Sequence, residues 1–443
     1  MKIENIFRMR RSFVGVVTLL GSSLLSPGNG VLRWGFGAED LGAAGSFGGT
    51  RGKAIAAMQV NPALLAGFEE NEATFSIRYL AGSGDFSRGG ITSSMRGGEG
   101  VYPDLAMAWR LNPQVVLGFG ASPISGLEAR WNYLDAPGGI GGISFGELRH
   151  ESRFVAVRLA AGLGWQVTDR WSLGLSAGAV RSEIDFNAPF IFQSNPALAN
   201  AKVDLDLETD GWAPSVELGS VYHASPDWTF GARVKLPVTL DNEGKAGVDF
   251  SAQLPPLGFG GAPPRNDYDA RAKTQLPLTI GAGGSWQAKD RLSLGLWVDW
   301  HQWSQSYDTF AVDLAGGSNG VINGAIGRDV SDRIPLDWKD RFVVSLGAEY
   351  ELSEEWTIRG GWRYGKSPVP GDLVTPLNGA IMEHALTAGA SWSRGDWQID
   401  LGYGHEFSQS AEVGASGYHA GEYSNSSLEA EVRHASVSFT RRF

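Results

Sequence analysis

The amino-acid sequence predicts an all-β fold, a 14-stranded antiparallel transmembrane β-barrel. Three observations predict it. Apolar residues recur at every second position in many segments, the connections between these segments alternate between short and long, and tryptophan gathers beside the short connections. A membrane-spanning barrel alternates lipid-facing and lumen-facing residues along each strand, and it has short turns on one side and longer loops on the other.

Fourteen segments show the two-residue period of strands with unlike faces. In the seventh segment, the face expected to meet lipid runs from Trp228 to Val238 and Leu240, whereas Arg233 and Lys235 fall on the lumen face. The fourteen expected strands are 70–82, 100–111, 114–125, 150–167, 171–186, 203–223, 228–250, 272–287, 291–309, 337–352, 356–366, 381–393, 397–408 and 428–443.

The connections between these strands alternate in length without exception. The short ones hold a few polar or turn-forming residues, which suits tight hairpins. Because fourteen is an even number, the first and the last strand are expected to have their free ends, and so the two ends of the barrel chain, on the side of the short turns. The short connections are 112–113, 168–170, 224–227, 288–290, 353–355 and 394–396, and the long ones are 83–99, 126–149, 187–202, 251–271, 310–336, 367–380 and 409–427.

Eight tryptophans lie within a few residues of the short connections. If the strands end together, these rings lie at one height and form the girdle that amphipathic aromatics make where hydrocarbon meets headgroups. The alternative is that each ring fills the core of a soluble protein. The eight are Trp109, Trp165, Trp171, Trp228, Trp286, Trp356, Trp392 and Trp397.

Composition and charge narrow the function classes. Charged residues make up 19% of the chain and the mean hydropathy is −0.14, as expected when the two faces of a barrel average out. The net charge of −11 argues against a nucleic-acid partner, which requires a basic face. The chain has no cysteine, which excludes disulfides and thiolate chemistry, and its seven histidines are scattered, so we expect no cofactor and no metal.

The N-terminus predicts export. The stretch MKIENIFRMRR is basic, and residues 12–25 that follow it are mostly apolar. This arrangement is typical of a secretory signal peptide, which we expect over residues 1–30, with a cut as late as residue 38. The alternative is an anchor helix, for which the apolar stretch is short. Export of a barrel predicts the outer membrane of a Gram-negative bacterium.

The chain ends on the alternating segment HASVSFTRRF, whose apolar face holds Ala435, Val437, Phe439 and Phe443. We expect this last strand to turn that face to lipid and to close the barrel against the first strand. A terminal aromatic such as Phe443 resembles the end signal that the barrel assembly machinery reads in outer-membrane barrels.

Four stretches of the sequence carry a resemblance to a known family: VNPALLAG, LGLWVDWHQWSQSYD, LDWKDRFVVSLGAEYELSEEWTIRGGWRYGKSPVP and VSFTRRF. In this order they resemble the outer-membrane long-chain fatty-acid transporters of the FadL/TodX type. The resemblance spans most of the exported chain. It implies a 14-stranded barrel that is plugged by an N-terminal segment, the hatch.

The resemblance places the hatch at residues 31–66 and the barrel at residues 70–443. Asn61, Pro62 and Ala63 resemble the NPA motif at the end of the family's hatch. From composition alone, the stretch LGAAGSFGGTRGKAIAAM is also compatible with a flexible linker, because it is rich in Gly and Ala and lacks strand alternation.

The resemblance further implies a kinked third strand that opens the barrel wall sideways. The stretch GASPISGL lies where the third strand should continue. Pro123 cannot donate a hydrogen bond to the sheet and Gly126 packs no side chain, so a gap or a bulge is expected here. The alternative is that the third strand ends at this point and a loop begins.

By alternation, several charged side chains point into the lumen. Inward charges commonly brace a plug through ion pairs, which is one interpretation of this set. The other is a cationic site for an anionic head group such as a carboxylate. The candidates for that site are Arg233 and Lys235, which are neighbours on one face, together with Arg158 and Arg359.

The third long connection contains the apolar residues Phe190, Ile191 and Phe192, directly after a proline. An apolar outer surface of this kind is a candidate entrance for hydrophobic ligands. The alternative is that these residues cap the mouth of the barrel.

The sequence contains no convincing catalytic set. The stretch GLSAG at residues 174–178 has the spacing of a nucleophile elbow, but it lies within an expected strand and not at a strand-to-helix turn. We therefore expect a passive outer-membrane channel for hydrophobic molecules, such as long-chain fatty acids or similar lipophiles, with sideways exit at the third strand. Its partners would be the ligand and outer-membrane lipid. The alternatives are an open diffusion porin for small polar solutes and, less favoured, a barrel enzyme.

Overall fold

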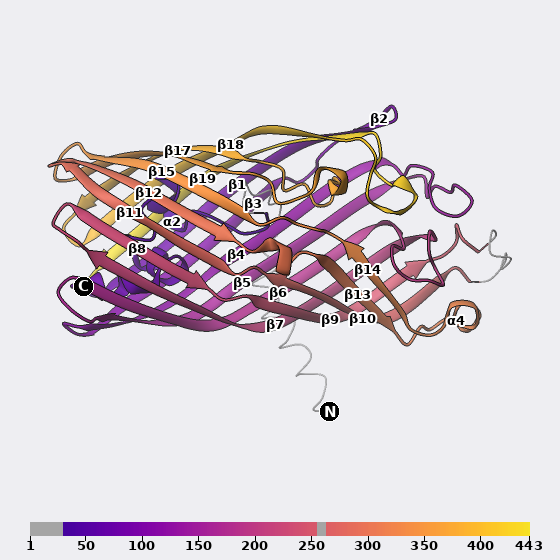
Figure 1. Cartoon of the computed structure of the whole chain (residues 1–443), viewed down its shortest axis with the longest axis horizontal. Coiled ribbons are helices and arrows are strands. Elements are labelled where there is room, and N and C mark those ends of the chain that lie inside the picture. Colours follow the sequence, from indigo (N-terminus) through magenta and orange to yellow (C-terminus); the bar gives the residue numbers. More distant parts are fainter. Residues whose placement is uncertain (1–29, 255–262) are drawn as a thin grey trace, which may run out of the picture.

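The computed structural model describes residues 30–254 and 263–443, so the expected signal peptide lies outside the described residues. The described chain forms the predicted 14-stranded antiparallel barrel, a long cylinder of tilted strands (Figure 1). The continuous strands are β1 (Glu72–Arg88), β3 (Glu99–Asn112), β4 (Val115–Leu134), β5 (Glu147–Gln166), β6 (Trp171–Ile191), β7 (Lys202–His223), β16 (Trp356–Gly365), β17 (His384–Arg394), β18 (Trp397–Val413) and β19 (Ser426–Arg442).

Four neighbouring strands on one side of the wall are each interrupted once, so each of them carries two labels. At two of these breaks stand Pro237 and Pro277, whose missing N–H cannot join the sheet. A short strand, β2 (Ile91–Ser94), pairs with the end of β1. The interrupted strands are β8 (Trp228–Lys235) with β9 (Val238–Asp249), β10 (Arg265–Leu276) with β11 (Thr279–Lys289), β12 (Leu292–His301) with β13 (Thr309–Ala315), and β14 (Val330–Pro335) with β15 (Arg341–Glu351).

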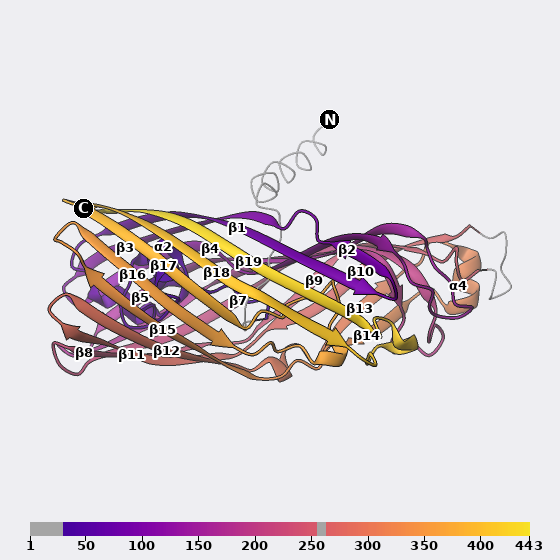
Figure 2. The ribbon, with the colours of Figure 1, turned by 90° about the horizontal axis from the view of Figure 1, so that it is seen from above.

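The last strand closes the barrel against the first. Strands β1 and β19 pair antiparallel from Glu72 opposite Arg442 to Arg88 opposite Ser426. They lie side by side along the cylinder in Figure 2. The wall therefore has no free edge at the chain ends, which a membrane-spanning sheet requires because lipid offers no hydrogen bonds.

Near the short turns, the outer face of the wall is apolar and the inner face is small and polar. Of the eight tryptophans expected in a girdle, Trp392 is half-buried and the others are exposed on the outside. Ser76 and Arg78 on the inner face of β1 are buried. This half of the wall has the face pattern that predicted a lipid-facing exterior.

Toward the long loops, the polarity of the two faces reverses. In β7, Trp212 and Leu218 point outward near the short turns, but Asp206 and Glu208 point outward further up, where Leu207 is buried inside. Strands in this region extend beyond their predicted ends, because charged outward residues make the sequence resemble a loop. Examples are β1, which reaches Arg88, β4, which reaches Leu134, and β6, which reaches Ile191.

The prediction that Val238 and Leu240 face lipid was wrong. Leu236 is 43% exposed, whereas Val238 and Leu240 are 6% and 1% exposed and line the interior. The break at Pro237 shifts the alternation by one residue, and such a shift moves every following side chain to the other face. An uninterrupted apolar pattern in the sequence thus passes from the lipid side to the lumen side.

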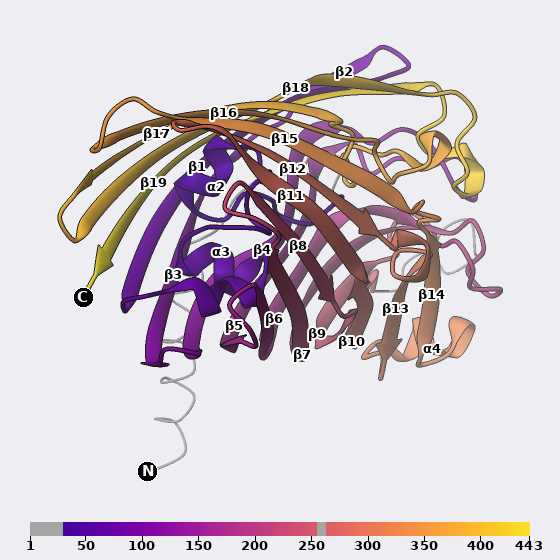
Figure 3. The ribbon, with the colours of Figure 1, turned by 60° about the vertical axis from the view of Figure 1, so that its left-hand side comes forward.

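The segment before β1 folds inside the barrel near the short turns (Figure 3). It contains the helices α2 (Gly37–Gly42) and α3 (Ala54–Gln59) and the 3₁₀ helix η2 (Pro62–Gly67). Further helices, η3 (Trp303–Gln305), α4 (Gly320–Ile326), η4 (Gly371–Leu373) and η5 (His419–Gly421), lie in connections. None of the helices in the described residues has the length and apolar character needed to cross a membrane.

Candidate functional site

The Asn61-Pro62-Ala63 triplet fastens the end of the hatch to the wall. The Asn61 Nδ2 donates to the Gly49 carbonyl at 2.8 Å and to the Ser220 carbonyl of β7 at 3.2 Å, and its Oδ1 accepts from the Ala63 N–H at 3.1 Å. Asn61 therefore caps the start of η2, whose first residue is the proline. One polar side chain joins the hatch to itself and to the barrel.

Glycines of the wall provide the room for this triplet. A β-carbon at Gly219 would lie 1.9 Å from the Asn61 Oδ1, and one at Gly174 would lie 2.1 Å from the Pro62 carbonyl carbon. Any other residue at these positions would displace the hatch. The same region contains Ser176, whose hydroxyl accepts from the Arg158 guanidinium at 2.8 Å. Within the GLSAG stretch, Gly174 thus makes room for the hatch, whereas Gly178 makes room for the backbone of Leu159 and Ala160 on β5.

Three cations of the wall hold the carbonyl end of helix α3. Arg158 donates to the Met58 carbonyl at 2.8 Å, Lys235 to the Gln59 carbonyl at 2.5 Å, and Arg233 to the Val60 carbonyl at 3.1 Å. The last carbonyls of a helix lack partners within it and form the negative end of its dipole. We call this arrangement of Arg158, Arg233 and Lys235 the α3 clamp.

Carboxylates of the wall neutralise the clamp. Glu217 lies 3.5 Å from the Arg158 guanidinium and 3.3 Å from the Lys235 ammonium, and Asp299 lies 2.7 Å from Arg233. The structure thus brings Arg158, Arg233 and Lys235 together, and their hydrogen-bond partners belong to the hatch and the wall.

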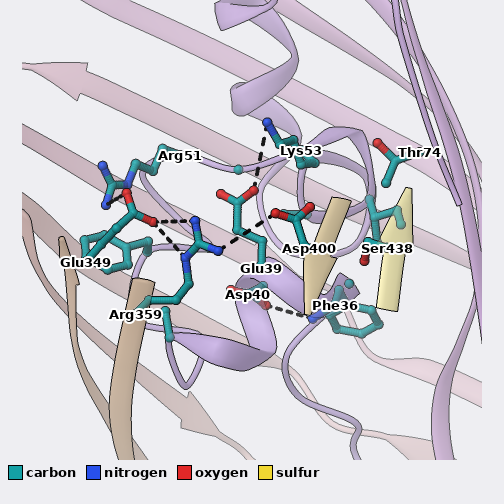
Figure 4. A pocket seen from close by; sticks show the side chains of 17 residues that line it. Phe36, Glu39, Asp40, Arg51, Lys53, Thr74, Glu349, Arg359, Asp400 and Ser438 are labelled. Carbon is teal, nitrogen blue, oxygen red and sulfur yellow. Dashed lines mark hydrogen bonds and ion pairs between the residues drawn. The ribbon is translucent and has the colours of Figure 1, made fainter. Parts of the chain in front are cut away.

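Arg359, the fourth cation that the sequence singled out, lies elsewhere. It contacts Glu349 at 2.8 Å and Asp400 at 3.9 Å, beside Glu39 of α2 (Figure 4). These residues line a small cavity of about 20 Å³, which none of the α3 clamp residues lines.

The wall pairing is incomplete between β3 and β4. Their last paired residues are Leu105 and Ala121, although β4 continues to Leu134. On the other side, the pairing of β4 with β5 shifts by one residue between Pro123 and Ser125. The predicted third strand, which is β4, therefore does not end at Pro123 but passes through a bulge there.

Residues 31–33 occupy the edge that β3 leaves free. The Arg33 N–H donates to the Ile124 carbonyl at 3.0 Å, the Gly126 N–H donates to the Val31 carbonyl at 3.1 Å, and Leu32 is bridged to Ser125. The chain before α2 thus acts as a short extra strand beside β4. We call residues 31–33 the edge segment.

Arg33 ties the edge segment to both neighbouring strands. Its two terminal nitrogens contact the two carboxylate oxygens of Asp104 on β3, each at 2.7 Å, and one also donates to the Pro123 carbonyl on β4 at 3.1 Å. Both side chains are nearly inaccessible. A bidentate Arg–carboxylate pair is among the stronger polar contacts in proteins. Sequence reasoning missed Arg33, because nothing in the Gly-rich stretch around it marks a partner 71 residues away.

Two cavities meet at the edge segment. The inner one, of about 80 Å³, lies between hatch and wall and is lined by Leu32, Arg33 and the α3 clamp. The outer one, of about 180 Å³, is lined mainly by apolar side chains, including Val31, Phe154, Leu207 and Trp338. An apolar cavity of about 150 Å³ is large enough to bind benzene.

Of the three apolar residues singled out in the third long connection, one lines this outer cavity. Phe190 lines it, and Ile191 and Phe192 are buried at 1% and 3% exposure beneath the outer loops. They contribute to the apolar interior at the mouth of the barrel, and only Phe190 among them is placed to touch a molecule in the cavity.

Glu422 is a further residue of the outer cavity that sequence reasoning missed. It follows η5 in the loop between β18 and β19. The pKa of its carboxyl is raised to about 7, mainly by burial and also by the neighbouring Asp135, although Lys202 and Arg88 act to lower it. The glutamate is one acidic residue among 48, and no pattern distinguishes it.

Comparison with known proteins agrees with this architecture. A family model described as "Outer membrane protein transport protein (OMPP1/FadL/TodX)" matches residues 29–443. The long-chain fatty acid transport protein of Salmonella typhi is 24% identical over 410 residues, which cover 86% of this chain and 88% of that protein.

Two solved structures have the same fold. The toluene transporter TodX of P. putida aligns with a TM-score of 0.76 at 18% identity, covering 92% of this chain and 99% of that one. A FadL homologue of Pseudomonas aeruginosa aligns with a TM-score of 0.74 at 17% identity, covering 94% and 100%.

A plugged 14-stranded barrel with these relatives is an outer-membrane transport protein of Gram-negative bacteria. The match over residues 29–443 shows that the chain belongs to the OMPP1/FadL/TodX family, whose members are channels for hydrophobic compounds and not enzymes.

The α3 clamp predicts the effect of Lys235→Met. The substitution removes the bond to the Gln59 carbonyl, while Arg158 still faces Glu217. A hydrogen bond from a charged group contributes about 1.5–3 kcal/mol. We expect the hatch to leave its seat about tenfold more often, measured as the open fraction in single-channel recordings from planar bilayers.

The matched control is Lys245→Met, which removes a lysine that is 80% exposed on the outer wall. Equal open fractions for Lys235→Met and the wild-type protein would show that the clamp does not hold the hatch.

Proposed function

We propose that the protein is a passive channel that carries lipophiles, such as long-chain fatty acids or monoaromatic hydrocarbons, across the outer membrane. The observation that carries this proposal is the apolar outer cavity, which adjoins the inner cavity at the edge segment: Val31 lines the first, and Leu32 and Arg33 line the second. The names of the relatives, a fatty acid transport protein and a toluene transporter, support the same substrate range.

The route begins at the outer loops. A ligand enters the outer cavity past Phe190 and waits above the edge segment. The passage opens when the edge segment leaves β4. Nothing in this route requires an energy source, because the ligand moves between apolar surroundings down its own concentration gradient.

The exit is proposed to lie sideways between β3 and β4. Above Ala121, the backbones of these strands are not paired with each other, and the edge segment pairs with β4 instead. Displacement of the segment would break the Arg33 contact with Asp104 and free the N–H of Gly126 and the carbonyl of Ile124. A gap would then open in the wall at Pro123, where the proline already prevents regular pairing.

The α3 clamp is proposed to brace the hatch and not to bind a ligand head group. All three cations contact α3 carbonyls and wall carboxylates, and Arg359 lies apart from them. Of the two roles that the sequence left open for Arg158, Arg233, Lys235 and Arg359, bracing is the one these contacts support.

Transport tests the proposal against an open porin. Cells of a Gram-negative host that lacks such a channel should accumulate radiolabelled long-chain fatty acid or toluene faster when they express the protein. Permeation of a small sugar should remain at background until residues 31–66 are deleted. Rapid sugar permeation through the intact protein, little changed by the deletion, would identify a porin instead.

The sideways exit predicts the effect of an engineered disulfide between Leu32→Cys and Ser125→Cys. These residues are bridged antiparallel neighbours, and the Cα distance of about 4.5–5.5 Å in such pairs suits a disulfide. The native chain has no cysteine to interfere. We expect the oxidised variant to lose ligand uptake in the cellular assay and to regain it with a reductant.

The control pair is Ser87→Cys with Ser427→Cys, which joins β1 to β19 away from the exit and should not slow uptake. Uptake at the wild-type rate through the oxidised Leu32–Ser125 variant would exclude this exit.

We propose that the last strand is also the signal for the barrel assembly machinery. Phe443 donates its N–H to the Asn71 carbonyl at 3.0 Å and packs against Trp109, but its ring is 49% exposed and accessible before closure. Deletion of Phe443 should lower the folded fraction, seen as the heat-modifiable band in gel electrophoresis of outer membranes, and Phe443→Trp should restore it. An unchanged band after deletion would contradict this role.

A further inference from the structure

The outer cavity has an unusual polar group in its apolar lining. Glu422 contributes its carboxyl beside Phe186, Leu377 and Tyr418. Among the residues that the structure describes, no hydrogen bond or ion pair within 4.0 Å engages this carboxyl. Glu422 is half-buried, and a carboxylate that is taken partly out of water without a partner destabilises the folded protein, so an unengaged carboxyl here calls for an explanation.

Several other polar side chains of the cavity are occupied, whereas the Trp338 indole N–H has no hydrogen-bond partner among the described residues. The Gln193 amide donates to the Ile191 carbonyl at 2.7 Å and accepts from the His419 N–H at 2.9 Å. Asn378 donates to the Leu373 carbonyl at 2.9 Å, and the Thr375 hydroxyl accepts from two backbone N–H groups. These groups support the loops and have little capacity left for a ligand.

The cation that lines the cavity is neutralised. Arg153 contacts Asp185 at 2.7 Å and Glu183 at 3.2 Å, two carboxylates for one guanidinium. Behind Glu422, Lys202 contacts Asp135 at 2.6 Å, and Arg88 lines the adjoining recess beyond ion-pair distance. The charge that a ligand meets in the outer cavity is therefore negative.

We propose that Glu422 determines the specificity of the outer cavity: among the lipophiles proposed above, it favours apolar molecules that carry a hydroxyl group, such as phenols or fatty alcohols, and it disfavours ionised fatty acids and other carboxylates of the same size. This inference rests on the proposed function and names the substrate class of that same site. The hydroxyl donates to the Glu422 carboxylate while the apolar body fills the space between Phe190, Leu207 and Trp338. A carboxylate would place a second negative charge beside the first, and among the described residues that line this cavity the one cation, Arg153, is already paired with two carboxylates.

The test uses three aromatic ligands of similar size with the purified full-length protein in detergent. Toluene, 4-methylphenol and 4-methylbenzoate are titrated by calorimetry at about pH 8.5, where Glu422 and the benzoate are ionised and the phenol is not. We expect the wild-type protein to bind 4-methylphenol most tightly and 4-methylbenzoate least.

Two variants separate the contributions of charge and hydrogen bonding. Glu422→Leu should weaken 4-methylphenol about tenfold, and Glu422→Gln should strengthen 4-methylbenzoate about tenfold, since a factor of ten corresponds to about 1.4 kcal/mol. Toluene should change less than twofold in both, which also shows that the cavity remains intact. Glu412→Gln removes the same charge from an exposed position on β18 and should alter none of the three.

The outcomes distinguish the two proposals. If the wild-type protein binds none of the ligands, the outer cavity is not a ligand site and the proposed function fails with it. If toluene binds normally but both Glu422 variants keep the wild-type order of the three ligands, the channel stands and the role of Glu422 is overturned.

Discussion

The constraint on which the rest depends is that backbone groups in lipid must be paired within the protein. The wall meets this constraint everywhere along β1 and β19, but between β3 and β4 it does so with residues that belong to the hatch side of the chain. Residues 31–33, which belong to neither strand, provide backbone partners for β4 at this place. Because this pairing is local and short, it is the part of the wall that the proposed opening would break while the ladders on either side remain intact.

The hatch itself is held by contacts that are individually modest. The α3 clamp supplies three hydrogen bonds to successive carbonyls at Met58, Gln59 and Val60, and Asn61 adds the contact with β7. Wall glycines at 174 and 219 allow the close approach. Each bond in isolation contributes on the order of 1–3 kcal/mol. Together they fix the position of the hatch, yet no single one is strong enough to prevent the edge segment from moving.

The barrel was predictable from the sequence because its signals are local: a two-residue period, polar turns and tryptophans beside them. The site was predictable only in part. Alternation placed Arg158, Arg233 and Lys235 in the lumen, but their partners are backbone carbonyls of α3, which leave no mark in the sequence. Arg33 and Asp104 meet across a gap that only the fold creates. Val238 and Leu240 were assigned to the wrong face because the break at Pro237 changes the alternation without changing the apolar pattern.

The change of faces at Pro237 has a counterpart on β4. Near the short turns, apolar side chains such as Phe119 on β4 point outward to lipid. Beyond the bulge at Pro123, apolar residues of the same strand, such as Leu127 and Tyr133, are buried inside. The apolar surface therefore lies inside the barrel at the top and outside it at the bottom, and on β4 it crosses the wall at the bulge. In the proposed route, a lipophile that follows apolar surface from the outer cavity reaches the β3–β4 gap, where the edge segment lies between the two strands, so the inversion of polarity along β4 supports the exit proposed there.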